Sequence, residues 1–318
     1  MGHEVTATAQ RDHGGGLDAA AGSFGGVRAD WLDLSTGINP VAYPLPDLPM
    51  DAWTALPDVA ARTRLQQAAR TFWNVPDAAG LCAVPGASAA IAHIPLLQDP
   101  GRVHIPGPTY NEHAASFAAA GWQITDGPAE ASVLVNPNNP DGRHWRARDL
   151  NGRLRIIDES FCDVTPTATL MDQALQPGTL VLKSFGKFWG LAGVRLGFVI
   201  GDPALVARLG ACLGPWPVAG PAQHIGAAAL NDPIWAKTTR DRLQTDAARL
   251  DLLMTQAGAA VIGGTTLFRL YQVDDAADWQ DKLARHRIWS RVFPYNSRWL
   301  RLGLPGPAGW SRVEAALE

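Results

Sequence analysis

Lys187 stands in a sequence context that suits covalent chemistry by an amine. An apolar run leads to Ser184, Lys187 follows three residues later, and Arg195 follows after a stretch that contains glycines. A lysine held in a dry, anion-lined pocket has a depressed pKa, and its neutral amine can then attack a carbonyl carbon to form a Schiff base. The window alone leaves a solvated loop lysine as an open alternative.

Three further clusters follow apolar, strand-like runs. Gly86-Ala87-Ser88 indicates a glycine turn at a helix start, where free backbone N–H groups bind anions, although a plain helix cap by Ser88 would explain the same residues. Asn139 lies among prolines and asparagines, which predict either a rigidly held amide donor or a simple turn. Asp158 ends an apolar strand, and a carboxylate there is costly unless a cofactor cation or a neighbouring arginine pairs with it.

The composition is that of an ordinary globular protein. The chain has 318 residues, 47% of them hydrophobic, and a net charge of −3, which argues against a nucleic-acid or membrane-surface partner. Its apolar stretches are too short to span a bilayer, and its N-terminus lacks the apolar segment of a signal peptide. Cys82, Cys162 and Cys212 show no metal-binding spacing and fit a reducing compartment. We therefore expect a cytoplasmic protein without a metal site.

Short apolar runs alternate with helical patterns over the first two thirds of the chain. The expected strands are 81–84, 102–105, 132–135, 154–157, 180–183 and 194–200, and helices are expected at 89–98 and 112–120. This alternation predicts an α/β fold with a mostly parallel sheet covered by helices. Because ligands of such sheets bind at the carboxyl ends of the strands, the four clusters should converge.

The pattern changes after about residue 203. Helical stretches at 203–210, 234–257 and 276–287, with strand-like pieces at 265–272, 288–292 and 299–304, predict a smaller α+β domain. The first 45 residues are rich in Gly and Pro and have little periodicity, which is typical of an arm that wraps the surface, a partner subunit or the active-site mouth. The predicted division is an arm over 1–45, a large domain over 46–215 and a small domain over 216–318.

The order of the four clusters resembles the aminotransferase class I/II family of pyridoxal 5′-phosphate (PLP) enzymes, the fold type I group. The specific motifs are Ser184-x-x-Lys187 with Gly193-x-Arg195-Leu-Gly, and Asn136-Pro-x-Asn139-Pro-x-Gly. The glycine turn at Gly86 is weak on its own. The resemblance covers nearly the whole chain and implies a large domain with a mostly parallel seven-stranded sheet plus a small α+β C-terminal domain.

The resemblance also implies a role for each cluster. Lys187 would carry the cofactor as a Schiff base, Asp158 would pair with the pyridinium nitrogen so that the ring acts as an electron sink, and Asn139 would bond the phenolic oxygen. Tyr110 matches the residue whose ring stacks on the cofactor and joins Lys187 and Asp158 as a predicted catalytic residue. The cofactor phosphate would be held by Gly86, Ala87, Ser88, Ser184 and Arg195.

Two positions depart from the family pattern. Phe161 stands where many relatives have a tyrosine that contacts the phenolic oxygen, so that hydrogen bond is not expected. Leu56 stands where many relatives carry a tyrosine that reaches the cofactor phosphate of the neighbouring subunit. The resemblance implies a homodimer with the active site near the subunit interface, and Leu56 cannot make that contact as a tyrosine would.

The N-terminal arm narrows the resemblance. His13-Gly14-Gly15-Gly16 and Ser35-Thr-Gly37-Ile-Asn39-Pro40 resemble the threonine-phosphate decarboxylase branch of cobalamin biosynthesis, a close relative of histidinol-phosphate aminotransferase. A flexible tail is the alternative for the glycine run. The implied substrate is a phosphorylated amino acid, with Arg301 as the arginine that pairs with its α-carboxylate in a bidentate fashion. The substrate residues implied are His13, Gly14, Gly37, Asn39, Arg291 and Arg301.

The implied reaction is decarboxylation of L-threonine O-3-phosphate to (R)-1-amino-2-propanol O-2-phosphate. A histidinol-phosphate-type aminotransferase is the alternative, because the bond that breaks at Cα depends on where the carboxylate and phosphate are anchored. A non-catalytic relative is a third hypothesis, and the presence of both Lys187 and Asp158 argues against it. A nicotinamide-dependent oxidoreductase would need a glycine motif after an early strand, and His13–Gly16 does not follow one.

Overall fold

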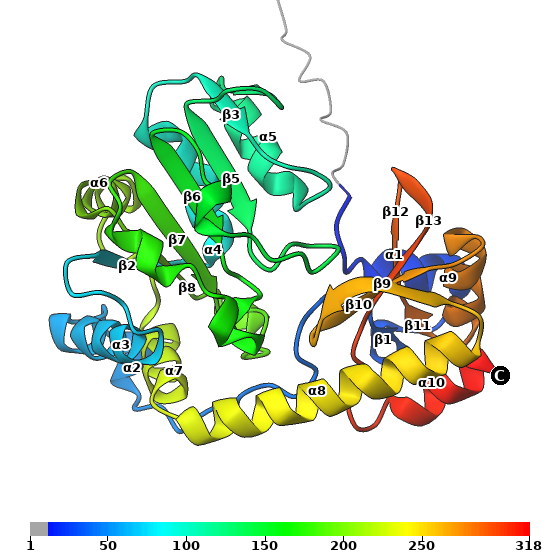
Figure 1. Cartoon of the computed structure of the whole chain (residues 1–318). Coiled ribbons are helices and arrows are strands. Elements are labelled where there is room, and N and C mark those ends of the chain that lie inside the picture. Colours follow the sequence, from blue (N-terminus) through cyan, green and yellow to red (C-terminus); the bar gives the residue numbers. More distant parts are fainter. Residues whose placement is uncertain (1–11) are drawn as a thin grey trace, which may run out of the picture.

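The computed structural model describes residues 12–318, and the first part of the predicted arm, 1–11, lies outside the described residues. A seven-stranded sheet forms the larger half of the molecule (Figure 1). In spatial order its strands are β2 (Gly80–Val84), β8 (Gly197–Gly201), β7 (Thr179–Ser184), β6 (Leu154–Asp158), β5 (Ala131–Val135), β3 (Arg102–His104) and β4 (Gln123–Ile124). β8 runs antiparallel to both of its neighbours, and the other neighbouring pairs are parallel. The predicted α/β class with a mostly parallel seven-stranded sheet is confirmed.

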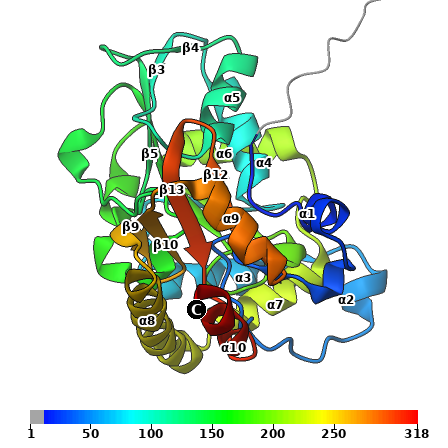
Figure 2. The same ribbon diagram turned by 90° about the vertical axis from the view of Figure 1, so that its right-hand side faces the viewer.

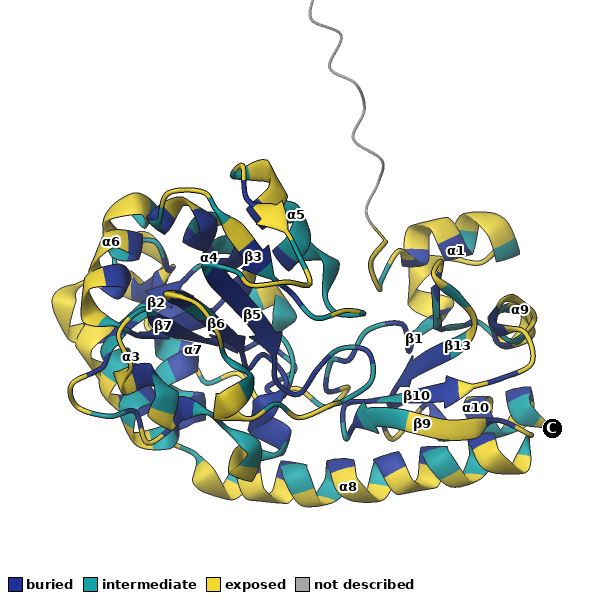
Figure 3. Cartoon of the chain, turned by 45° about the horizontal axis from the view of Figure 1, so that its top comes forward, coloured by how far each residue is buried: buried dark blue, intermediate teal, exposed yellow. Residues whose placement is uncertain are grey.

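Both faces of this sheet are buried, which explains the nearly continuous apolar runs of its strands (Figure 3). Successive residues alternate between two cores: Val181 packs on one face, and Leu180 and Leu182 pack on the other. The first core includes residues of α3 (Val59–Phe72) and α7 (Gly220–Leu230). The second includes residues of α4 (Ala87–His93), α5 (Asn111–Ala119) and α6 (Pro203–Leu213).

Several predicted element bounds differ from the structure, and two of the differences have a clear local reason. The expected helix 89–98 ends as α4 at His93 and continues only as a 3₁₀ turn, Ile94–Leu97, that contains Pro95. The expected strand 194–200 begins only at Gly197, because Arg195 adopts a left-handed conformation (φ 53°) after the 3₁₀ turn Ala192–Val194. That turn places Arg195 at the end of the sheet rather than inside a strand.

A four-stranded antiparallel sheet forms the second half. Its order is β12 (Arg291–Phe293), β13 (Asn296–Gly303), β10 (Phe268–Gln272) and β9 (Ala260–Thr265). Helices α9 (Ala276–Arg285) and α10 (Trp310–Leu317) accompany it, with α9 beside β13 in Figure 2. The long helix α8 (Pro233–Gln256) runs past both sheets (Figure 1). The domain boundaries stay a prediction.

Part of the predicted arm is built into the second half. Strand β1 (Leu32–Asp33) pairs in parallel with β11 (Ile288–Trp289), and helix α1 (Leu17–Phe24) precedes it. Only Leu17 and Ala20 of α1 are buried, in a cluster with Trp31 and Ala284. The sequence did not predict this helix, because the segment has little hydrophobic periodicity. A few tertiary contacts stabilise the helix, rather than a broad apolar face.

Glycines let the Asn139 loop rest on the second sheet. Asp141 O accepts a hydrogen bond of 2.8 Å from Gly264 N on β9. Gly142 has a φ of +74°, and a Cβ there would lie 2.0 Å from Gly264 O. The backbone approach therefore excludes a side chain at Gly142 and holds Asn139 beside the half of the molecule that carries Arg301.

Candidate active site

Lys187 lies in the loop between β7 and β8. Its Nζ is 5.2 Å from the centre of the Phe161 ring, and this contact by itself favours the charged amine. Burial, with Arg301 and Arg195 adding repulsion and Asp158 opposing them, lowers the pKa of Lys187 to about 8. A substantial fraction of the amine is therefore neutral near physiological pH, which is the state that attacks a carbonyl carbon.

Asp158 ends β6 as a buried carboxylate with three hydrogen bonds. Its Oδ2 lies 2.9 Å from His113 Nε2, and its Oδ1 accepts from Ser160 Oγ at 2.5 Å and Ser160 N at 2.9 Å. Burial would raise the pKa of Asp158, but the hydrogen bond and charge of His113, with the Ser160 bonds, lower it below its usual value. The expected partner was a cofactor cation or an arginine, and within the protein it is His113.

An anion-binding end is formed by Arg195 and the start of α4. Arg195 Nη2 donates to Ser88 Oγ at 2.9 Å, and Arg195 Nη1 donates to Ala192 O at 3.0 Å. Gly86 has a φ of +83°, and a Cβ there would lie 2.6 Å from Arg195 Nη2. Gly86 thus leaves room for the guanidinium, although it does not itself line the cavity.

One cavity brings together all the other residues predicted to bind the cofactor. Most of its walls come from a strand end or from the segment that follows it, as expected for an open α/β sheet. The predicted residues in the lining are Ala87, Ser88, Tyr110, Asn139, Asp158, Ser184, Lys187 and Arg195, and Phe161 lines it as well.

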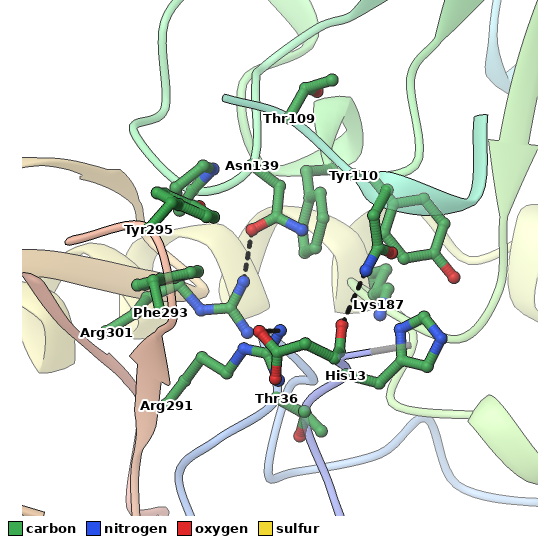
Figure 4. Close-up of a pocket in the computed structure, with 16 residues that line it drawn as sticks. His13, Thr36, Thr109, Tyr110, Asn139, Lys187, Arg291, Phe293, Tyr295 and Arg301 are labelled. Atoms are coloured by element: carbon green, nitrogen blue, oxygen red, sulfur yellow. Dashed lines mark hydrogen bonds and ion pairs between the residues drawn. The ribbon is translucent and has the colours of Figure 1, made fainter. Parts of the chain in front are cut away.

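A second cavity adjoins the first and carries the residues predicted for the substrate (Figure 4). Tyr110, Asn139, Phe161 and Lys187 line both cavities, so the two are continuous around the amine. The predicted substrate residues in the second lining are His13, Gly14, Gly37, Arg291 and Arg301. A Cβ on Gly37 would lie 2.9 Å from the Phe161 ring and 2.8 Å from the Phe268 ring, which explains the glycine.

Arg301 lines the second cavity and is hydrogen-bonded to Asn139, which lines both cavities. One of its Nη atoms donates to Asn139 Oδ1, as the dashed line in Figure 4 shows, and the other donates to Ser35 O at 2.6 Å. Burial, followed by the charge of Arg291, lowers the pKa of Arg301 to about 10. The two arginines therefore create a strongly cationic pocket next to the Lys187 amine, which suits an anionic ligand.

Asn39 is placed elsewhere and does not line either cavity. Its Nδ2 donates to Phe188 O at 2.8 Å, its backbone N donates to Lys187 O at 3.0 Å, and its Oδ1 accepts from Arg242 Nη2 at 2.6 Å. Arg242 belongs to α8 and also pairs with Asp246 at 3.0 Å. These contacts hold the backbone of the Lys187 loop rather than a ligand.

Sequence reasoning missed His113, Ser160, Asp12 and Arg242. Ser160 follows Asp158 by two residues and could have been proposed from that spacing as a local hydrogen-bond donor. His113 and Arg242 reach their partners only through the fold, at sequence separations of 45 and 203. Asp12, paired with Arg291 at 2.7 Å, likewise had no local signal.

The chain is similar to known proteins over nearly its whole length. A family model described as aminotransferase class I and II matches residues 125–309. Threonine-phosphate decarboxylases from Pseudomonas aeruginosa and a Sinorhizobium species are each 39% identical to this chain in alignments of 326 positions, which cover 96% of this chain and 97% of each relative. The crystal structure of histidinol-phosphate aminotransferase from Sinorhizobium meliloti in complex with pyridoxal-5′-phosphate has a TM-score of 0.81 and 18% identity, and the match covers 99% of this chain and 98% of that one.

The chain belongs to the aminotransferase class I and II family. The predicted family, fold type I and class of PLP-dependent enzyme are thereby confirmed. The cavity residues also fit this cofactor, because a low-pKa carboxylate, an amine with a lowered pKa and an arginine–serine anion site lie around one space. These groups suit a ring cation, an aldehyde carbon and a phosphate, in that order. The role of each residue toward the cofactor stays a prediction.

The contacts of Asn39 predict a structural effect for its removal. Asn39→Ala should lower the free energy of unfolding of the cofactor-free protein by about 1–3 kcal/mol, because Phe188 O loses its donor and Arg242 keeps only Asp246 as a partner. Arg242→Ala should cost a similar amount, and the double variant should cost less than the sum. Chemical denaturation of each variant measures this.

Lys237→Ala is the matched control. It removes an exposed ion pair with Asp241 from α8, the helix that also carries Arg242. It should change the free energy of unfolding by less than about 0.5 kcal/mol. If Asn39→Ala instead raises only the KM for substrate and leaves stability unchanged, Asn39 is a substrate ligand, as its place in the sequence motif suggested.

Proposed function

We propose that this protein decarboxylates L-threonine O-3-phosphate to (R)-1-amino-2-propanol O-2-phosphate, with PLP as its cofactor, in cobalamin biosynthesis. The observation that carries the proposal is the 39% identity to threonine-phosphate decarboxylases over 96% of the chain. A cationic pocket with two arginines beside Lys187 supports it, because the substrate has both a carboxylate and a phosphate.

In this proposal, each of the two arginines binds a different anionic group of the substrate. Arg301 binds the α-carboxylate through its planar guanidinium, and Arg291 binds the phosphate together with His13 and the Gly14 backbone. Asn139 accepts a hydrogen bond from Arg301 and lines the cofactor cavity too, so it fixes the substrate arginine relative to the cofactor. Tyr110 lines both the cofactor cavity and the substrate cavity, so it forms part of the wall that they share.

Lys187 and Asp158 carry the chemistry. Bound PLP supplies an electron sink that accepts the electron pair left on Cα when the carboxylate departs as CO₂. Asp158, ionised and held by His113 and Ser160, stabilises a cation at the end of the cavity. Lys187, once protonated from solvent, delivers as an ammonium group the proton that Cα needs to complete the product, and its lowered pKa favours this transfer. The Phe161 ring lies beside this amine and limits the access of water to it.

Release of carbon dioxide separates this function from that of a histidinol-phosphate-type aminotransferase. The purified holoenzyme, given L-threonine O-3-phosphate and no keto acid, should release one CO₂ per substrate consumed. Lys187→Ala should slow release about 10²–10⁴-fold, since it removes the amine. The exposed Lys237→Ala serves as the control and should keep full activity. Amino transfer that depends on an added keto acid, without CO₂, would show the aminotransferase instead.

We further propose a homodimer. Five large apolar side chains in the segment 45–59 are more than three-fifths exposed: Leu45 (64%), Met50 (73%), Trp53 (64%), Leu56 (65%) and Val59 (66%). An apolar patch built from these side chains would suit a protein–protein interface. Because Leu56 replaces a phosphate-binding tyrosine of many relatives, the partner is not expected to use this position on the cofactor phosphate.

Sedimentation velocity tests the dimer. The unchanged protein should sediment at about twice the 33.9 kDa chain mass, and Trp53→Asp should weaken association at least about tenfold by placing a charge in the interface. Ile234→Asp is a matched control at a side chain that is 78% exposed on α8. A monomer at micromolar concentration, or equal effects of both substitutions, would contradict the proposed surface.

A cytoplasmic location is also proposed. Within residues 12–318 no helix is both long and apolar enough to cross a membrane. Cys82, Cys162 and Cys212 are free thiols, which supports a reducing environment.

A further inference from the structure

Asp12 places a carboxylate inside the cavity assigned to the substrate. Its Oδ2 lies 2.7 Å from Arg291 Nη2, and both residues line the cavity that contains Lys187 and Arg301. The Arg291 side chain is 12% exposed, whereas the Asp12 side chain is 42% exposed. The arginine side chain is therefore mostly buried, and the carboxylate is the partner with access to solvent.

The arm that carries Asp12 is docked by contacts that do not involve its carboxylate. Gly15 N donates to Ser35 Oγ at 2.6 Å, and Trp289 Nε1 donates to Gly15 O at 2.9 Å. A Cβ on Gly14 would lie 2.5 Å from Ser35 O, so a glycine is needed for this approach. Asn111 Nδ2 holds the Asp12 carbonyl at 2.8 Å. The Asp12 side chain can consequently leave Arg291 while the arm stays in place.

Asp12 introduces a negative charge into a cavity where the other charged side chains described are positive. Arg291, Arg301 and Lys187 line the cavity, and Asp12 is the acidic residue in its described lining. Burial lowers the pKa of Arg291, and Asp12 opposes this shift. Burial and the charge of Arg291 also lower the pKa of Arg301, so the two guanidinium groups repel each other. The Asp12 carboxylate partly neutralises the positive charge of Arg291, as a bound anion would do.

We propose that Asp12 is an exchangeable counter-ion of Arg291, which pairs with this arginine in the absence of substrate and yields it to the substrate's phosphate. The inference rests on the proposed function, in which Arg291 binds that phosphate. A ligand must outcompete a resident carboxylate at this position. A doubly charged phosphate can do so more readily than a singly charged anion, so Asp12 selects for the phosphorylated substrate.

Inorganic phosphate is the probe that tests the exchange. Calorimetric titration into the holoenzyme should show phosphate binding about three- to tenfold tighter in Asp12→Asn than in the unchanged protein, because the competing carboxylate is gone. Asp18→Asn removes one negative charge from the same arm at a side chain that is 84% exposed, and should leave phosphate affinity unchanged. In an Arg291→Gln background, Asp12→Asn should no longer tighten binding.

Two results would overturn the proposal. Unchanged or weaker phosphate binding by Asp12→Asn would mean that Asp12 orients Arg291 rather than competing for it. An equal gain in Asp18→Asn would mean that overall charge, not the ion pair, governs affinity. Because phosphate binding is measured without turnover, a protein that releases no CO₂ from L-threonine O-3-phosphate would refute the proposed function and leave this measurement interpretable.

Discussion

The placement of a lysine amine among positive charges is the constraint on which the rest of the site depends. Lys187 lies near Arg301 and Arg195, and burial together with these charges lowers its pKa to about 8. Asp158 is the carboxylate that opposes them. Burial would neutralise that carboxylate if His113 and Ser160 did not hydrogen-bond it. The amine can be neutral and the carboxylate ionised in the same cavity because each has its own set of neighbours.

Keeping this arrangement fixed requires contacts from both halves of the molecule. The large sheet supplies Asp158 and the Lys187 loop, whereas Arg301 comes from β13 of the second sheet. Asn139 joins the two through Arg301, and its loop rests on β9 through the close approach of Gly142 and Gly264. On the other side, Asn39 and Arg242 tie the Lys187 backbone to α8. The geometry around the amine is thus set by the packing of the two halves.

Much of this arrangement could be predicted from the sequence, because its signals are local. The apolar runs that end in Asp158 or lead to Ser184 predict strands, and the carboxyl ends of parallel strands gather the residues that follow them. Lys187, Asn139 and Arg195 were found in this way.

The rest depends on contacts between distant segments. His113 lies 45 residues before its partner Asp158, and Arg242 lies 203 residues after Asn39, so no sequence spacing connects them. Asn39 illustrates the limit most clearly. Its motif suggested a substrate ligand, but its amide is satisfied by the Phe188 carbonyl and its oxygen by Arg242. Helix α1 was missed because so little of it is buried.

The pKa of the Lys187 amine in the cofactor-free protein tests the central claim most directly. The chain has four lysines, so NMR of lysine-labelled protein, with Lys187→Met for assignment, can follow this amine through a pH titration. We predict a pKa of about 8 for this amine. A pKa near the ordinary value of 10.5 would contradict it, because the amine would then be solvated and protonated at the pH at which it must react.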